Sequence, residues 1–106
     1  MIAIRPLRSS RDFRRVLSAG RRARRGGLVV CVAPGDGRTV HLGLAVKARP
    51  AVVRNRAKRR LRAAFRECAP GPGSVVVRSD AGAATVEFAR LRADLGAALE
   101  QAGGLK

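Results

Sequence analysis

Apolar side chains recur every three or four residues in three segments of this chain, which predicts three amphipathic helices. The segments are residues 9–19, 51–68 and 85–102. In the first, Phe13, Val16 and Leu17 form the apolar stripe, and Gly20 can end the helix. Prolines and glycines at 70–73 follow the second segment and two glycines at 103–104 follow the third, so each helix has a sequence-encoded end.

Three further segments have the pattern of β-strands. Residues 28–33 are a continuous apolar run, residues 39–46 are a second strand, and residues 74–77 are a fully apolar third strand that we expect at the centre of the sheet. The sequence Pro-Gly-Asp-Gly at 34–37 is a turn signal, so the first two strands are expected to form an antiparallel hairpin. Gly43 indicates a close approach to the backbone there.

The element order is therefore αββαβα, with helices packed on a small sheet. A chain of 106 residues is expected to form one domain, residues 1–106, with no linker or repeat. Its three aromatic residues are all phenylalanine, so valine, leucine and alanine must build the core.

The middle helix is the most informative segment because it combines an apolar stripe with dense positive charge. Val53, Leu61 and Phe65 can anchor it to a core. Its cationic residues and one asparagine predict an RNA-binding face: Arg54, Asn55, Arg56, Lys58, Arg59, Arg60, Arg62 and Arg66. Solvated helix faces usually mix charges of both signs, because like charges four residues apart repel. A polyanionic partner would relieve that repulsion.

The net charge of +16 is unevenly distributed. Residues 1–25 carry nine arginines against one acid, whereas residues 74–106 carry four cations and four acids and are interpreted as scaffold. This asymmetry is typical of nucleic-acid binders. Secondary basic contacts are expected from a connector at 21–25 and from the segment before the basic helix: Arg21, Arg22, Arg24, Arg25, Lys47 and Arg49.

The sequence offers no catalytic or metal-binding set of its own. Cys31 and Cys68 lack metal-ligand spacing and are interpreted as reduced core residues, while the single histidine, His41, is interpreted as a surface residue. No segment is apolar enough to span a bilayer, and the N-terminus has no apolar signal core, so no membrane partner and a cytoplasmic location are expected.

Residues 51–65 read Ala-Val-Val-Arg-Asn-Arg-Ala-Lys-Arg-Arg-Leu-Arg-Ala-Ala-Phe. They resemble the signature helix of the bacterial ribonuclease P protein component, approximately A-V-x-R-N-R-x-K-R-x-x-R-x-x-F, at every specified position. Segments 12–20, 43–46, 75–78 and 88–91 also resemble that family. The shorter connection Lys47-Ala48-Arg49-Pro50 differs from the family pattern, so the turn into the helix must differ too.

The resemblance implies an α+β two-layer sandwich, with a small mixed sheet and a left-handed βαβ crossover. It implies a monomeric protein that binds the catalytic RNA in a 1:1 complex and helps it remove the 5′ leader of precursor tRNA. The RNA and its Mg²⁺ would perform the chemistry, and the protein alone would bind no cofactor. A leader cleft would lie between the first helix and the sheet, for which we name Phe13, Leu17, Val30, Cys31, Val32 and Leu44. Relatives carry aromatic residues where this chain has Leu17 and Cys31.

Three other readings remain open. A ribosomal or other structural RNA-binding protein fits the size and charge but would lack the signature helix. A DNA-binding regulator could place the basic helix in a major groove, although no dimerisation seam is visible. An autonomous nuclease would need acid, base or metal groups, and this chain shows no such set.

Overall fold

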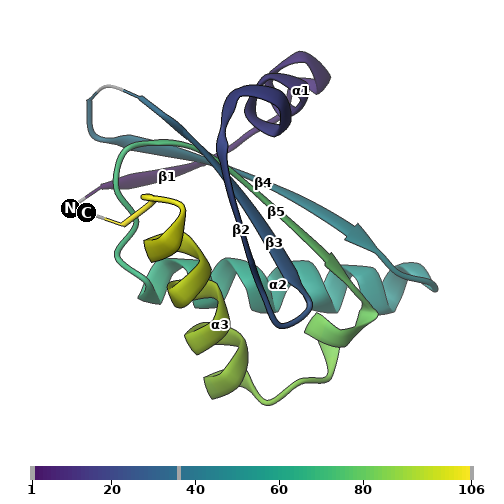
Figure 1. The fold of residues 1–106 in the computed structure, drawn as a ribbon. Helices are drawn as coiled ribbons and strands as arrows, with labels where there is room; N and C mark the ends of the chain where they lie inside the picture. Colours follow the sequence, from purple (N-terminus) through teal and green to yellow (C-terminus); the bar gives the residue numbers. More distant parts are fainter. Residues whose placement is uncertain (1, 36, 106) are drawn as a thin grey trace.

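A computed structural model describes residues 2–35 and 37–105 (Figure 1). In these ranges the elements are β1 (Ala3–Pro6), α1 (Ser10–Ala19), β2 (Arg21–Arg25), β3 (Leu28–Pro34), β4 (Thr39–Lys47), α2 (Ala51–Glu67), β5 (Gly73–Asp80), the 3₁₀ helix η1 (Ala81–Ala84) and α3 (Phe88–Gln101). The three predicted helices are confirmed, although α3 begins three residues later than expected, after η1.

The strands form one mixed sheet in the order β1-β4-β5-β3-β2. β5 lies at the centre, as predicted, and pairs in parallel with β4 and antiparallel with β3. β1 joins the outer edge of β4 in parallel, and β2 pairs with β3 as an antiparallel hairpin. The α+β architecture is confirmed, whereas the left hand of the β4–α2–β5 crossover stays a prediction.

The predicted hairpin between the strands at 28–33 and 39–46 is wrong, because β5 lies between them. Residues 73–77 of β5 are buried, and this apolar strand gains most by pairing on both edges. The turn expected at 34–37 includes Asp36, which lies outside the described residues. The expected connector at 21–25 is instead strand β2, whose central Ala23 is buried while the four arginines are exposed.

One face of the sheet carries the main core, covered by α2 and α3 (Figure 1). β-Strand side chains at alternate positions of β3, β4 and β5 face these helices. They are Val30, Val32, Val40, Leu42, Val75 and Val77. From the helices, Leu61, Phe65, Leu95 and Leu99 are fully buried against them. The predicted anchoring of the basic helix by Leu61 and Phe65 is therefore confirmed.

The opposite face of the sheet is only partly covered, by α1. Val16 packs with Leu7, Cys31 and Val76 in a smaller buried cluster. Phe13 projects from the same helix onto β4, where a side chain at Gly43 would place its Cβ 2.5 Å from the Cζ of the ring. Gly43 thus makes room for the Phe13 ring, and the close approach predicted there is confirmed.

Arg60 stabilises the packing of α2 on the segment that leads into α3. Its guanidinium donates to the carbonyl of Ala83 at 2.9 Å and also to the carbonyl of Val86. The same group lies 6.0 Å from the centre of the Phe88 ring. The prediction that Arg60 belongs to the RNA-binding face is wrong, because these interactions direct its side chain toward η1.

We expect replacement of Arg60 by methionine to lower the free energy of unfolding by about 1–3 kcal/mol, since two carbonyls lose a charged donor. Arg59→Met is the matched control, because Arg59 is exposed on the same helix and its change should stay within about 0.5 kcal/mol. Urea unfolding of both variants measures the difference. Equal stabilities would show that the Arg60 interactions contribute nothing to the fold.

Candidate nucleic-acid interface

Helix α2 carries most of the predicted RNA-binding residues on the surface that faces away from the core. Asn55, Arg56, Arg59, Arg62 and Arg66 are exposed, and Arg54 and Lys58 are half-buried. The only acid on the helix is Glu67, whose carboxylate lies 3.0 Å from the guanidinium of Arg92 on α3. Among the described residues, none of the cations of this face forms an ion pair. We call these seven residues the α2 face.

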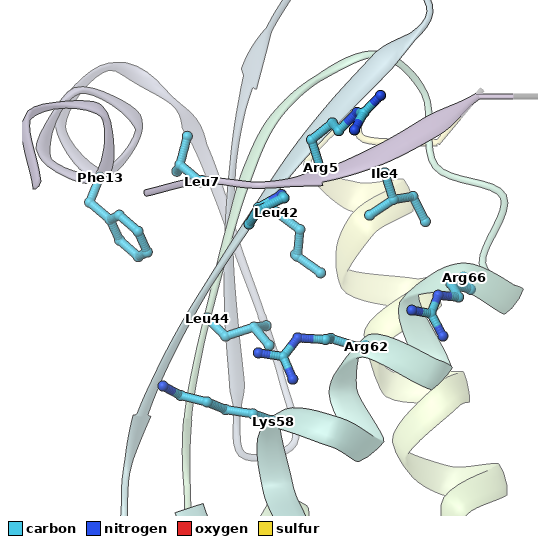
Figure 2. Close-up of a pocket in the computed structure, with 10 residues that line it drawn as sticks. Ile4, Arg5, Leu7, Phe13, Leu42, Leu44, Lys58, Arg62 and Arg66 are labelled. Atoms are coloured by element: carbon cyan, nitrogen blue, oxygen red, sulfur yellow. The ribbon is translucent and has the colours of Figure 1, made fainter. Parts of the chain in front are cut away.

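Three residues of the α2 face also line a cavity of about 480 Å³ at the edge of the sheet. Lys58, Arg62 and Arg66 follow one another four residues apart along the helix, and Figure 2 shows Lys58 and Arg62 extending toward Leu44 of β4. The other lining residues come from β1, α1 and β4: Ile4, Arg5, Pro6, Leu7, Phe13, Leu42 and Leu44. We call this cavity the edge pocket.

The face of the sheet beside α1 carries a second cationic surface. Arg24 pairs with Val29, Val29 with Arg78, and Arg78 with Ala45, so the four residues form one row across β2, β3, β5 and β4. Paired residues share a face of the sheet, and these four line a common hollow. This row, which we call the open sheet face, lies next to the row of Cys31, Val76 and Gly43 beneath α1.

Sequence reasoning missed Arg78, because the C-terminal part of the chain is electrically neutral and was interpreted as scaffold. The alternation of side chains along the third strand could have identified Arg78. Val76 and Arg78 are two residues apart, so they point to the same face of the sheet, and only Val76 lies under α1. A cation at the end of a central strand is therefore presented beside the first helix.

The six residues predicted for a leader cleft do not share one surface. Phe13, Leu17 and Cys31 belong to the cluster beneath α1, with Phe13 and Leu17 only half-buried. Val30 and Val32 are buried in the main core on the opposite face, so their placement in a cleft is wrong. The physical reason is that successive side chains of a strand point to opposite faces of the sheet, so Val30 and Val32 point away from the face that carries Cys31.

Leu44 lies between the main core and the edge pocket. Its side chain packs at the margin of the main core, yet it lines the edge pocket together with Phe13. The two meet because β1 pairs with β4 only as far as Leu42, which leaves the next part of the β4 edge uncovered. Phe13 and Leu44 are thus brought together at this edge, whereas Leu17 and Cys31 remain beneath α1.

The residues predicted as secondary basic contacts are all exposed. Arg21, Arg22, Arg24, Arg25, Lys47 and Arg49 come from β2, from the end of β4 and from the turn before α2. The alternation of β2 around buried Ala23 places Arg22 and Arg24 on the side of α1, and Arg22 Nη2 donates to the Leu17 carbonyl at 3.4 Å. Arg24 therefore belongs to the open sheet face, and Arg22 lies on the same side of the sheet beside it.

The remaining chemistry-bearing groups of the described residues are few. Cys31 is buried and Cys68 half-buried, and both are free thiols. Burial raises the pKa of the Cys68 thiol, and its Sγ lies 3.2 Å from the carbonyl of Ala64. No group of three or more potential metal ligands occurs in residues 2–35 and 37–105. No helix in these ranges is long and apolar enough to cross a membrane.

The chain is similar in structure to ribonuclease P proteins from two bacteria. The Staphylococcus aureus RNase P protein superimposes with a TM-score of 0.79 at 21% identity, covering 95% of this chain and 97% of that one. The Thermotoga maritima RNase P protein gives a TM-score of 0.73 at 25% identity, with 92% and 94% covered. A complex of the T. maritima protein with 1-(4-fluorophenyl)-2-thiourea gives 0.76 at 26% identity, with 94% and 99% covered.

None of the curated protein sequences matches this chain. The sequence model of the family described as Ribonuclease P, however, matches residues 3–103, which include every strand and helix described above. The chain therefore belongs to the ribonuclease P protein family.

Proposed function

We propose that this protein is the protein subunit of ribonuclease P, and that it binds the catalytic RNA through the α2 face and the 5′ leader of precursor tRNA beside α1. Family membership supports a role in tRNA 5′ processing and a ribonuclease P RNA as partner. The observation that carries the proposal is the presence of two separate cationic surfaces on one small domain, the α2 face and the open sheet face. A structural RNA-binding protein with a single partner would need only one.

The α2 face suits a folded RNA because it presents fixed cations on a rigid, anchored helix. Each phosphate contact releases counterions, so affinity falls with salt in proportion to the contacts made. Arginine adds bidentate contacts to phosphate, and Asn55 adds a neutral donor and acceptor. The face holds no acid except at its end, where Glu67 is paired with Arg92.

The surface beside α1 suits a single strand because it combines a ring with flanking cations. Phe13 is half-buried over Gly43, so one part of its ring can still receive a base. Arg22, Arg24 and Arg78 lie on the same side of the sheet and can follow the phosphates of the strand. Stacking on aromatic side chains with nearby cations is how many proteins bind single-stranded RNA.

In this proposal the catalytic RNA and its Mg²⁺ carry out the hydrolysis, in a complex with one copy of the protein. The protein contributes by reducing repulsion between phosphates and by holding the leader. With a net charge of +16 it can replace part of the Mg²⁺ that the RNA would otherwise need. A ribosomal protein, the alternative considered from the sequence, is disfavoured by the family match.

The direct test is cleavage of a precursor tRNA by a bacterial ribonuclease P RNA at low Mg²⁺, with and without this protein. We expect strong stimulation by the protein, with cleavage at the mature 5′ end, and no cleavage by the protein alone at any Mg²⁺ concentration. Specific cleavage by RNA-free protein would overturn the assignment of catalysis to the RNA, and the absence of stimulation would overturn the proposed function.

For the α2 face, we expect Lys58→Met combined with Arg62→Met to weaken binding to the catalytic RNA several-fold. The slope of log affinity against log salt should become shallower by about two, because two phosphate contacts are lost. The control is Arg38→Met with Arg90→Met, which removes the same charge elsewhere. Identical salt slopes for the two double variants would place the RNA on another surface.

For the leader, we expect Phe13→Ala to weaken binding of a long-leader precursor to the reconstituted enzyme by roughly 1–3 kcal/mol per base stacked. A leaderless substrate should be bound almost as by the wild type. Arg78→Met should show the same selectivity, through loss of a phosphate contact. The measurement is the affinity of the reconstituted enzyme for both substrates. An equal loss of affinity for both, together with a lower melting temperature of the Phe13→Ala protein, would show that Phe13 is only a packing residue.

A further inference from the structure

We infer that the edge pocket is a nucleotide site that takes one unstacked nucleotide of the catalytic RNA, with its phosphate on α2 and its base against Leu42 and Leu44 of β4. This inference rests on the proposed function, because it concerns the partner of the α2 face. It adds a base-binding component to a helix that otherwise offers charge and one amide.

The charge of the pocket selects an anion. Lys58, Arg62 and Arg66 come from α2, Arg5 comes from β1, and no acid lines the cavity. The three helix residues are spaced four residues apart on one side of α2, so their side chains line the pocket along the helix. Because no described acid pairs with these groups, an incoming phosphate would face no competing ion pair within the described part of the chain.

The interior of the pocket selects an apolar, flat group beside that anion. Ile4, Leu42 and Leu44 supply aliphatic surface, and Figure 2 shows the Phe13 ring extending from α1 toward β4 on the far side. A cavity of about 480 Å³ is within the range of sites for small ligands. A free phosphate would leave this apolar surface unused, whereas a nucleotide matches both parts.

The backbone of β4 adds hydrogen-bonding groups at the same place. Leu7 N donates to Leu42 O at 2.9 Å, so the polar groups of Leu42 point to the outer edge of the strand. Two residues further on, the N–H and C=O of Leu44 point to the same edge, and β1 pairs no further than Leu42. Within the described residues no strand covers this position. An adjacent donor and acceptor match the hydrogen-bonding edge of a base.

The test of the site itself uses the protein and two small probes, adenosine monophosphate and ribose 5-phosphate, at equal ionic strength. Methyl NMR signals of Ile4, Leu42 and Leu44 report the pocket. We expect the nucleotide to bind about tenfold more tightly than the sugar phosphate, because its base buries apolar surface against these side chains, and to shift their methyl signals. Equal affinities for the two probes, or shifts absent from these methyl groups, would overturn the inference.

A pair of variants connects the pocket to the RNA. Leu44→Ala removes part of the base-binding surface, and Val46→Ala is the control because Val46 is a half-buried residue of the same strand and face that lies outside the pocket. We expect Leu44→Ala to lose the preference for the nucleotide over the sugar phosphate and to weaken catalytic RNA binding several-fold. Its salt slope should be unchanged, because no charge is lost. Val46→Ala should behave as the wild type in both assays.

These measurements separate the pocket from the proposed function. If wild-type protein stimulates cleavage and binds the catalytic RNA but shows no preference for the nucleotide, the pocket inference fails alone. If Leu44→Ala and Val46→Ala bind the RNA equally well while only the first loses the nucleotide, the pocket binds nucleotides but not the catalytic RNA, which also contradicts the inference. Failure of stimulation by the wild type would instead reject the proposed function.

Discussion

Burial of the apolar side of α2 against the sheet is the interaction on which the rest of this structure depends. The side chains of α2 that face the core are fully buried: Ala57, Leu61, Ala64 and Phe65. They hold the helix in place although the cations on its other side repel one another. A buried leucine or phenylalanine contributes roughly 1.5–3 kcal/mol, whereas a like-charged pair four residues apart costs only about 0.2–0.5 kcal/mol. The free energy gained by burial therefore exceeds the repulsion between the cations. The helix keeps its cationic side chains in place although no acid of the described residues pairs with them.

The position of α2 also determines where the other functional elements lie. As the connection between β4 and β5, it covers one face of the sheet, and Arg60 holds η1 and the start of α3 beside it. α1 then packs on the opposite face and covers only part of it. The uncovered part is the open sheet face. The sheet thus separates two cationic surfaces, and the edge pocket lies at the β4 edge between them.

The helices could be predicted from the sequence because each carries its own period of apolar residues and its own end signals. Strand pairing could not, because it depends on contacts distant in the chain. The four arginines of β2 mask the apolar pattern of a strand, so β2 is recognisable only from its pairing with β3. β5 follows a helix of 17 residues in the chain, yet it lies between β3 and β4 in the sheet.

For the candidate site, too, the parts that depend on one helix could be predicted, and the parts that depend on strand pairing could not. The α2 face follows from one helix, and the residues predicted for it are exposed or half-buried there, whereas Arg60 packs toward η1. Arg60 lies three residues after Ala57 and four before Ala64, both buried, and this spacing was the signal for its contact with η1. The leader cleft needs several strands, so Val30 and Val32 were assigned to the wrong face and Arg78 was missed.

The central claim is that two different RNAs meet two different surfaces of this domain. The most direct measurement tethers a hydroxyl-radical source to a cysteine introduced by Val52→Cys on α2 or Ala45→Cys on the open sheet face, both exposed positions, after Cys68→Ser and with Cys31 buried. In the reconstituted enzyme with precursor tRNA, the source at Val52 should cleave the catalytic RNA and the source at Ala45 should cleave the 5′ leader. Cleavage of the leader from Val52, or of the same RNA segment from both positions, would contradict the account.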